Sequence, residues 1–391
     1  MKVLFQSRVD LYNPRGGDTM QIENTKSAIE KADSSVKIDI VPEVKVKDIE
    51  KYDIVHLFNL DWICETYPQA KLAKKHKKPL VLSAIHHSED EVKIYEKKAR
   101  YDIRRVYNAL IPSQALRDMG KNIYRSFFNR KKISPAFIQL IGGIRRQQRK
   151  VLEMSDVVFV QTAQEAEDII KDFKFNNLKW IKVVNGVAVD IFKSPDKKKF
   201  QNLSKEKFGV NIRGKKLLLN VGRIEPRKNQ LKLIEVFKML KNQQNEEDWN
   251  LAFIGALGKN SIEYNYRFLH EIKKHTNILF FGSQPQEIVA SAMAQSGIYV
   301  HPSWFETTGL VSIEAALAGM TVVASGDRVK EYLGNDAFYC DPSSAESILN
   351  AILEADVSDA DTDLRKRIVN EFIWEKTAEQ TINVYKNLLK S

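Results

Sequence analysis

The sequence of 391 residues contains only two cysteines, Cys64 and Cys340, and they lie far apart. So few cysteines exclude a disulfide framework and show no metal-ligand spacing, which favours an intracellular protein in a reducing compartment. No apolar run approaches the roughly 20 residues that a membrane-spanning helix requires. The N-terminal stretch MKVLFQSRVDLY is interrupted by Arg8 and Asp10 and does not have the pattern of a signal peptide. Internal repeats are also lacking.

Length and composition predict an ordinary globular protein of two domains. Hydrophobic residues make up 43% of the chain and charged residues 28%, which is typical of soluble domains. A chain of 391 residues exceeds the size of a single core and divides most naturally into domains of roughly 150 to 200 residues.

The positive charge is concentrated in one segment. Residues 97–150 contain fifteen lysines or arginines against two acids, a net charge of +13, whereas the whole chain carries +11. The remaining residues therefore sum to −2. The sequence predicts that any polyanion binds through this segment.

Short apolar runs alternate with helical patterns along most of the chain. Runs of four to six residues rich in Val, Ile, Leu and Phe, without clean alternation, are typical of strands covered on both faces. Alternation of strands and helices predicts an α/β fold with doubly wound parallel sheets, about four units in the first half and five in the second. The predicted strands are 2–5, 53–58, 80–85, 156–161, 217–222, 251–255, 278–282, 297–300 and 321–325.

A linker and a closing helix define the domain boundaries. Residues 183–203 contain an Asn-Gly turn, a proline and a lysine run, which is typical of a linker. Residues 372–390 have apolar residues along one side of a helix. We therefore expect an N-terminal domain over 1–184, a second domain over 185–371 and a terminal helix over 372–391. Ligands of such sheets bind outside the carboxyl ends of the strands.

Three loops that follow predicted strands contain candidate binding residues. Arg223 and Lys228 precede a helix, an arrangement that suits a phosphate group, although a solvated basic loop has the same pattern. Gly16 and Gly17 allow a close backbone approach to an anion, or form a plain turn; neither the P-loop nor the GxGxxG pattern is present there. His86 and His87 follow another strand and could contact a sugar hydroxyl, or belong to a charge-satisfied turn with nearby acids.

The stretch HPSWFETTGLVSIEAALAGM (301–320) places two glutamates in an apolar neighbourhood. Glu306 falls in a loop after a strand and Glu314 in the following helix, with the helix N-terminus between them. If the span were fully helical, they would lie about 12 Å apart. This layout suits the two ends of an elongated ligand whose anionic centre lies at the helix N-terminus, as in a nucleotide sugar.

GRIEPRKNQ (222–230) followed by FETTGLVSIEAALAG (305–319) resembles the retaining GT-B glycosyltransferases of family 4, whose signature is Glu-x7-Glu. The resemblance covers most of residues 180–390, including Asn-Gly-Val at 185–187 and Trp-Glu-Lys at 374–376, and is thinner in the N-terminal half. It implies a GT-B architecture of two Rossmann-like domains facing across a cleft, with the terminal helix crossing back to the first domain.

The resemblance also implies roles for the candidate residues. Glu306 would hold the donor sugar, Glu314 would bind the ribose, and Ser283 would lie in the loop beside the base. His86 or His87 would contact the sugar, and the register from Pro79 favours His86. The groups expected around the diphosphate are Gly17, Arg223, Lys228 and the backbone N–H groups of Thr308, Gly309 and Leu310.

The same resemblance implies the chemistry. The donor would be a UDP- or GDP-linked sugar, no metal or other cofactor is expected, and transfer would proceed with retention. Because no covalent nucleophile stands out, we expect attack on the same face that the leaving phosphate departs from. Asp359 and Asp361 imitate the metal motif of the other glycosyltransferase fold, but they lie in a polar loop and are interpreted as solvent-facing. Ser325-Gly326 replaces the Gly-Gly pair that is frequent in the family, so contacts from that loop are not expected.

The basic segment suggests where the protein acts. Phe127 and Phe128 interleave with Arg130, Lys131 and Lys132, a composition suited to docking on an anionic membrane surface from the cytoplasmic side. A saccharide or lipid-linked saccharide acceptor, as in relatives that build surface polysaccharides or glycolipids, would follow. A solvated helical face is the simplest alternative. The functional alternatives are a nucleic-acid- or polyanion-binding protein and a GT-B-fold sugar-nucleotide epimerase.

Overall fold

The computed structural model describes residues 1–13, 16–99, 143–244, 249–295, 297–358 and 362–390. The five residues predicted to contact a membrane, and Asp359 and Asp361, lie outside these ranges. Within the described residues, no helix has both the length and the apolar character needed to cross a membrane. The described residues form two compact units, one of 1–89, 143–186 and 374–390 and the other of 90–99 and 187–373.

These units begin and end close to the predicted boundaries. The chain passes from unit 1 to unit 2 at residues 186–187 and returns at 373–374. Residues 90–99, which the sequence places in the N-terminal domain, cluster with unit 2. The predicted linker is too long, because helix α10 (Lys197–Phe208) occupies its second half. The Asp196 side chain accepts a hydrogen bond from the N–H of Lys198 and caps α10, and lysines are good helix formers.

Unit 1 is built on a six-stranded parallel sheet with the order β2-β1-β3-β4-β5-β6. Its strands are β1 (Lys2–Gln6), β2 (Lys37–Val41), β3 (Ile54–Phe58), β4 (Leu80–Ser83), β5 (Val157–Val160) and β6 (Trp180–Lys182). Its helices are α1 (Gly17–Ala32), η1 (Ile49–Lys51), α2 (Ile63–Lys75), α7 (Ile144–Met154), α8 (Ala163–Phe173) and α18 (Trp374–Leu388), while α3 (Glu89–Lys98) starts at its border with unit 2.

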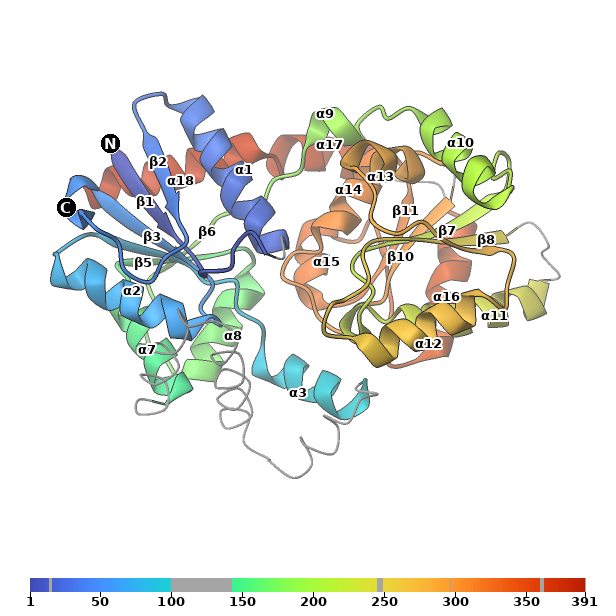
Figure 1. Cartoon of the computed structure of the whole chain (residues 1–391), viewed down its shortest axis with the longest axis horizontal. Helices are drawn as coiled ribbons and strands as arrows, with labels where there is room; N and C mark the ends of the chain where they lie inside the picture. Colours follow the sequence, from blue (N-terminus) through green and yellow to red (C-terminus); the bar gives the residue numbers. More distant parts are fainter. Residues whose placement is uncertain (14–15, 100–142, 245–248, 296, 359–361, 391) are drawn as a thin grey trace. The chain divides into compact units, whose positions relative to one another are not determined.

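Helices cover both faces of this sheet (Figure 1). Successive strand residues point to opposite faces, so Leu4 joins a core with α2, α7 and α8, whereas Val3 and Phe5 join a core with α1 and α18. Helix α18 therefore completes the core of unit 1 although it lies at the end of the chain. Its predicted apolar face is buried at Ala378 and Tyr385.

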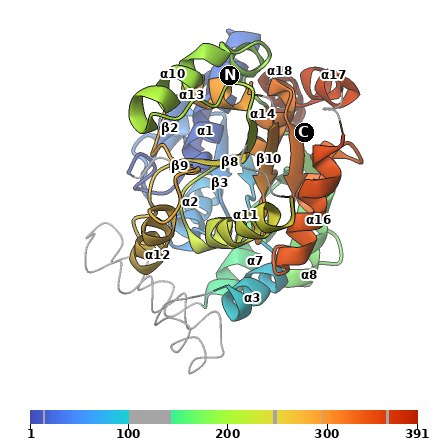
Figure 2. The same ribbon diagram turned by 90° about the vertical axis from the view of Figure 1, so that its right-hand side faces the viewer.

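Unit 2 also has a six-stranded parallel sheet, with the order β12-β11-β10-β7-β8-β9. Its strands are β7 (Lys216–Val221), β8 (Trp249–Ile254), β9 (Ile278–Phe280), β10 (Gly297–His301), β11 (Thr321–Ala324) and β12 (Phe338–Tyr339). Its helices are α9 (Val189–Phe192), α10, η3 (Pro226–Lys228), α11 (Gln230–Gln244), α12 (Ile262–Ile272), α13 (Gln286–Met293), α14 (Leu310–Ala318), α15 (Asp327–Leu333), α16 (Ala345–Asp356) and α17 (Thr362–Glu371). Helices α11 and α16 lie side by side (Figure 2) and with α12 cover one face.

The predicted α/β fold with two doubly wound parallel sheets is confirmed, as are all nine predicted strands. The sequence analysis missed β2, β6 and β12. All three lie at the edges of their sheets, where a strand pairs on one side only and is less buried. Lys37 and Asp39 of β2 and Lys182 of β6 interrupt the apolar runs for this reason.

Candidate functional site

The strand order of unit 2 places its candidate residues at one point. Strands β7 and β10 are neighbours, and the chain continues from them toward opposite edges of the sheet. Ligands of doubly wound sheets bind at such a switch point, outside the carboxyl ends of the strands. The loop after β7 carries Arg223 and Lys228, and the loop after β10 carries Glu306. Residues 78 positions apart in sequence therefore meet.

A buried ion pair forms the centre of this site. The Lys228 ammonium donates to Glu306 Oε1, and Arg227 Nη1 lies 3.8 Å from Glu306 Oε2. Only 11% and 10% of the Lys228 and Glu306 side chains are exposed. Burial alone raises the pKa of Glu306, but Lys228 and Arg227 outweigh it and hold that pKa well below its usual range. Burial also lowers the pKa of Lys228, an effect that Glu306 opposes only in part.

His301 and Tyr299, which the sequence analysis did not identify, extend this pair into the sheet. His301 Nε2 lies 3.3 Å from Lys228 Nζ and 3.1 Å from Glu306 Oε1, and its Nδ1 lies 3.0 Å from the Tyr299 hydroxyl. That hydroxyl donates to the Val221 carbonyl over 3.3 Å. Burial and Lys228 lower the pKa of His301, so the ring is neutral. Nε2 cannot serve both neighbours at once, because the Lys228 ammonium only donates and the Glu306 carboxylate only accepts.

The position of His301 at the end of β10, five residues before Glu306, was the available signal in the sequence. Arg227 was also missed, because it falls between the two cations that the spacing suggested. Its guanidinium bonds Glu225 at 3.2 Å and lies 5.3 Å over the ring of Phe305.

The N-terminus of α14 lies beside this pair and presents open backbone donors. Gly309 caps the helix with φ 66°, and a Cβ there would lie 2.9 Å from Val329 Cγ2. Thr308 is buried, and no side chain caps the helix. Among the described residues, no acceptor is bonded to the N–H groups of Gly309 and Leu310. An anion at this point would receive those bonds and the helix dipole.

Glu314, one turn into α14, differs from Glu306 in its surroundings. It is half-buried, and among the described residues it has no hydrogen-bond or ion-pair partner. Burial raises the pKa of Glu314 to about 8, so the carboxyl group is mostly protonated at neutral pH. A polar ligand group that donates to this carboxyl would favour its ionised form.

Arg223 and Ser283 lie toward the outside of the site. The Arg223 side chain is 43% exposed, with Nη1 3.7 Å from Glu225 Oε2. Ser283 is exposed in the loop that follows β9 at the edge of the sheet. The loops after β7, β8 and β9 are bound together through Gly255, whose N–H donates to the Gly282 carbonyl at 2.8 Å. A Cβ on Gly255 would lie 2.0 Å from the Gly222 oxygen, so only glycine permits this contact.

In unit 1, His86 is fully engaged within the fold. Its Nδ1 lies 2.8 Å from Asp61 Oδ1 and its Nε2 lies 2.9 Å from Asp172 Oδ2. Burial lowers the pKa of His86, but the two carboxylates outweigh it and raise the pKa to about 10, so the ring is an imidazolium. His87 is half-buried, and its N–H donates to Asp61 Oδ2 at 3.3 Å. A ligand would have to displace a carboxylate to reach the ring nitrogens of His86.

Gly17 is the first residue of α1 and is exposed. No atom lies within 4 Å of a Cβ placed on it. The preceding loop is held by Arg8, which is buried and ion-paired with Asp18 at 2.7 Å and Asp10 at 3.0 Å. A fixed helix N-terminus with space around its first residue is compatible with close approach of an anion.

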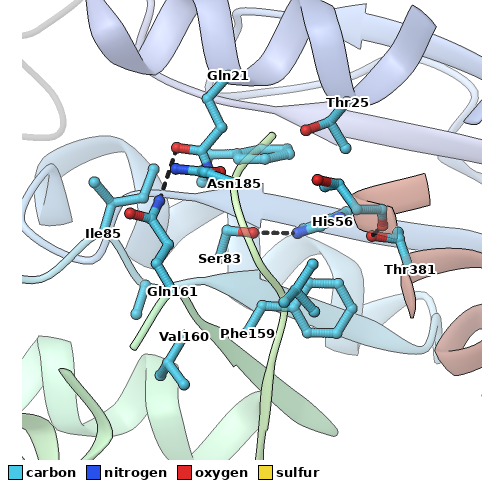
Figure 3. A pocket seen from close by; sticks show the side chains of 14 residues that line it. Gln21, Thr25, His56, Ser83, Ile85, Phe159, Val160, Gln161, Asn185 and Thr381 are labelled. Atoms are coloured by element: carbon cyan, nitrogen blue, oxygen red, sulfur yellow. Dashed lines mark hydrogen bonds between the residues drawn. The ribbon is translucent and has the colours of Figure 1, made fainter. Parts of the chain in front are cut away.

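A small cavity of about 10 Å³ lies inside unit 1, lined by residues of α1, β3, β4, β5 and α18. Figure 3 shows how its side chains lie. His56 Nε2 lies 2.8 Å from Ser83 Oγ, its Nδ1 lies 2.5 Å from the Tyr385 hydroxyl, and Gln161 donates to Gln21. Burial lowers the pKa of His56 to about 3, so this histidine is neutral. The cavity has room for about one water molecule and lies among the core contacts of α18.

Comparison with known proteins shows what the chain is similar to. Residues 183–373 match the family model of glycosyl transferases group 1. The O-antigen chain mannosyltransferase B of Escherichia coli is 27% identical over 175 residues, 44% of this chain and 45% of the relative. The D-inositol 3-phosphate glycosyltransferase of Corynebacterium jeikeium (strain K411) is 24% identical over 253 residues, 62% of this chain and 59% of the relative. The chain thus spans about half the length of these curated relatives.

Solved structures are similar along the entire chain. Sucrose-phosphate synthase from Thermosynechococcus elongatus superposes with a TM-score of 0.72 at 16% identity, covering 100% of this chain and 99% of that one. HepE from Anabaena, in complex with UDP and glucose, superposes with a TM-score of 0.70 at 13% identity, covering 99% of both chains.

The fold is therefore that of the GT-B glycosyltransferases, two Rossmann-like domains with parallel sheets. Residues 183–373, which comprise nearly all of unit 2, form a domain of the glycosyl transferases group 1.

Proposed function

We propose that this protein transfers a glycosyl group from a UDP- or GDP-linked sugar to a saccharide or lipid-linked saccharide acceptor, with retention and without a metal ion. The observation that carries the proposal is the buried Lys228–Glu306 pair beside the uncapped N-terminus of α14. A buried ion pair is costly to maintain and by itself is weak evidence of a structural role. The backbone N–H groups at the N-terminus of α14, next to this pair, can donate hydrogen bonds to the oxygens of a diphosphate.

Each part of the site has a role in this proposal. The diphosphate lies at the N–H groups of Gly309 and Leu310, where Lys228 and Arg223 neutralise the charge that develops on it. Glu306 accepts hydrogen bonds from the sugar hydroxyls, and Glu314 binds the ribose. Ser283 lies toward the base. The family resemblance further assigns Gly17 to the diphosphate and His86 or His87 to the sugar.

The chemistry follows from where charge develops. Cleavage of the glycosidic bond places negative charge on the leaving diphosphate and positive charge on the sugar. Cations and N–H dipoles that are already in position stabilise that diphosphate without reorganisation. The leaving phosphate oxygen takes the proton of the acceptor hydroxyl, so departure and attack occur on the same face. Anomeric configuration of the product tests this step, and an inverted product contradicts it.

The proposals for the acceptor substrate and for the cellular location of the protein rest on its sequence. One relative is named for an O-antigen chain and others for inositol phosphate, which supports a saccharide or glycolipid acceptor. We place the protein in the cytoplasm, peripheral on the inner face of the membrane, with docking through the segment that contains Arg130, Lys131 and Lys132. Polysaccharide or glycolipid biosynthesis is the corresponding process.

The first experiment measures melting temperatures of the purified protein with UDP, GDP and a panel of their sugars. A ligand that binds only the folded state raises the melting temperature with its concentration and affinity. We expect a rise of several degrees for one nucleotide and at least a tenfold weaker affinity in Lys228→Ala. Lys273→Ala, which removes an exposed cation of the same unit, is the matched control and leaves the shift unchanged.

Other outcomes separate the alternatives. If no nucleotide shifts the folded wild-type protein and oligonucleotides do so in a salt-dependent manner, the protein binds polyanions and the proposal fails. If a sugar nucleotide is converted without an acceptor and without release of UDP or GDP, the protein is an epimerase. Release of the nucleoside diphosphate that requires an acceptor supports glycosyl transfer.

A further inference from the structure

A groove of about 1040 Å³ lies on unit 1, between the segment 41–52 and one side of helix α2. Its volume is at the upper end of the range of small-molecule sites, roughly 300–1,000 Å³. Helix α2 contributes five residues, which recur every three or four positions and therefore lie along one side of the helix: Tyr67, Pro68, Lys71, Leu72 and Lys75. None of the candidate residues for glycosyl transfer lines this groove.

The floor of the groove is apolar. Val44, Val46, Tyr67, Pro68 and Leu72 are half-buried there, with part of each side chain still open to solvent. Val46, Tyr67 and Leu72 also pack against the core of unit 1, so the floor is continuous with a fixed core. Apolar surface in a concave site favours an apolar occupant, since burial of each CH₂ group is favourable.

The rim of the groove is cationic. Five exposed lysines surround the floor, against one acid, Glu43. Those lysines are Lys45, Lys47, Lys51, Lys71 and Lys75. None of them forms an ion pair with another residue that the structure describes. By contrast, Lys74 on the same helix pairs with Asp156 at 2.7 Å. The rim therefore presents local positive charge, although the chain outside residues 97–150 sums to −2.

The wall of the groove is anchored to the interior. The carbonyl of Glu43 accepts hydrogen bonds from the side chains of Gln6 and Gln69, at 3.1 and 3.0 Å. Both glutamines are fully buried, and Gln69 also donates to the Ser7 carbonyl at 2.9 Å. The loop is thus attached to β1 and α2 at the point where the groove begins. A wall held in this way needs no reorganisation before a ligand enters.

We propose that this groove binds an anionic phospholipid of a membrane surface, with an acyl chain on the apolar floor and the headgroup phosphate among the rim lysines. An apolar floor with an unpaired cationic rim matches the two parts of such a lipid. Nucleic acid would match the rim but would leave the valines and Leu72 without a partner. The inference does not depend on the identity of the sugar donor.

Co-sedimentation of the full-length protein with vesicles tests this assignment. Vesicles of phosphatidylcholine alone are compared with vesicles that also contain phosphatidylglycerol. We expect binding to the anionic vesicles, and a loss of at least tenfold in Lys71→Glu/Lys75→Glu. Val44→Asn, which changes no charge, reduces binding about threefold, because the floor becomes polar at the site of the acyl chain.

A matched control separates the groove from general charge. Lys198→Glu/Lys199→Glu makes the same change of charge on exposed lysines of α10 in unit 2 and leaves binding within twofold of the wild type. Lys71→Gln/Lys75→Gln is a milder pair that is used if the reversal prevents folding. Thermal unfolding with and without nucleotide shows that each variant is folded and keeps its donor site, so failure here is distinct from failure of the proposed activity.

Several results would overturn the proposal. Binding of the Lys71/Lys75 variants within twofold of the wild type shows that another surface, such as residues 127–132, binds the vesicles. An equal loss in the α10 control shows a non-specific charge effect. An unchanged Val44→Asn shows that no acyl chain enters the groove. Groove-dependent binding of an oligonucleotide without vesicle binding assigns the site to nucleic acid.

Discussion

Both units contain a six-stranded parallel sheet, but the buried charged groups of the two units differ in how they are paired. In unit 1 the imidazolium of His86 is held between Asp61 and Asp172. In unit 2 the Lys228–Glu306 pair lies beside an uncapped helix and a carboxyl group, Glu314, that the described residues leave without a partner. Charge in the first cluster is satisfied within the fold. The second cluster is incomplete, and this difference indicates where a ligand binds.

The order of the strands explains part of this difference between His86 in unit 1 and the Lys228–Glu306 pair in unit 2. In unit 1 the chain reverses its direction across the sheet between β1 and β3, whereas in unit 2 it does so between β7 and β10. His86 follows β4 and lies beside the switch point of its sheet, while Lys228 and Glu306 follow the two strands that form the switch point. Residues at that point border open space rather than a neighbouring crossover.

The largest effect is expected from His86→Asn, which leaves the buried carboxylate of Asp172 and the partly exposed carboxylate of Asp61 without their cation. Breaking a buried charged network costs roughly 3–5 kcal/mol. The folded pKa of His86 lies at about 10, above the unfolded value. Its contribution is therefore fully present below about pH 6.5 and is lost as pH rises through 10. Urea unfolding of wild type and variant between pH 6 and 10 measures the difference.

His76→Asn is the control for this variant, because His76 also pairs with a carboxylate, Glu50, but at the surface of unit 1. We expect a loss below about 1 kcal/mol for that surface pair. Equal losses for the two histidines would show that His86 is not the structural centre that we infer.

A smaller effect is expected from Glu314→Gln in unit 2. Burial raises the pKa of Glu314 to about 8, so its favourable contribution is present below the unfolded pKa near 4.5 and is lost as pH rises through 8. The variant should be more stable than the wild type at pH 9 by about 1–2 kcal/mol, since solvent reaches the half-buried carboxyl. Urea unfolding at pH 5 and pH 9 measures this, and an identical pH dependence in the two proteins contradicts it.

An effect of similar size is expected from Gly309→Ala, and the smallest from Gly17→Ala. Gly309 has φ 66°, and its added Cβ would meet Val329, so we expect a loss of about 1–2 kcal/mol and a reduced nucleotide-induced shift. Gly17 has open space around it, so its alanine variant should be nearly as stable as the wild type. Thermal unfolding of both variants, with and without nucleotide, makes the comparison. A stable Gly309→Ala with an intact shift would show that the tight cap is not required.

The sequence was most informative where burial is most complete. Central strands such as β3 and β10 are covered on both faces and read as continuous apolar runs. Edge strands such as β2 and β6 carry lysines and an aspartate because one side faces solvent, so their runs are broken. The sequence analysis assigned the first half of α10 to the linker because this segment begins with a run of lysines. Its few apolar residues do not form a stripe that would distinguish a helix from a linker.

The candidate site shows the same division. Glu306, Lys228 and the glycine cap are recognisable from the spacing within two short segments. His301, Tyr299 and Arg227 join them only through the parallel pairing of β7 with β10. The register from Pro79 favoured His86 over His87 as the sugar contact, and the structure places the ring nitrogens of His86 against Asp61 and Asp172. Pairing of a side chain with residues 25 and 86 positions away leaves no local signal.

By itself the sequence determined the class of fold and the number of domains, and it identified Glu306 and Glu314 as candidate binding residues. Hydrophobic periodicity and motif spacing are local properties and can be read without the structure. The tertiary structure alone decided which charges are satisfied, since pairing depends on strand order and on contacts between distant residues. It also decided that lysines scattered over residues 45–75 surround one apolar groove. The net charge of the chain outside residues 97–150 does not reveal these lysines. They form a cationic site only because the fold places them around the same groove.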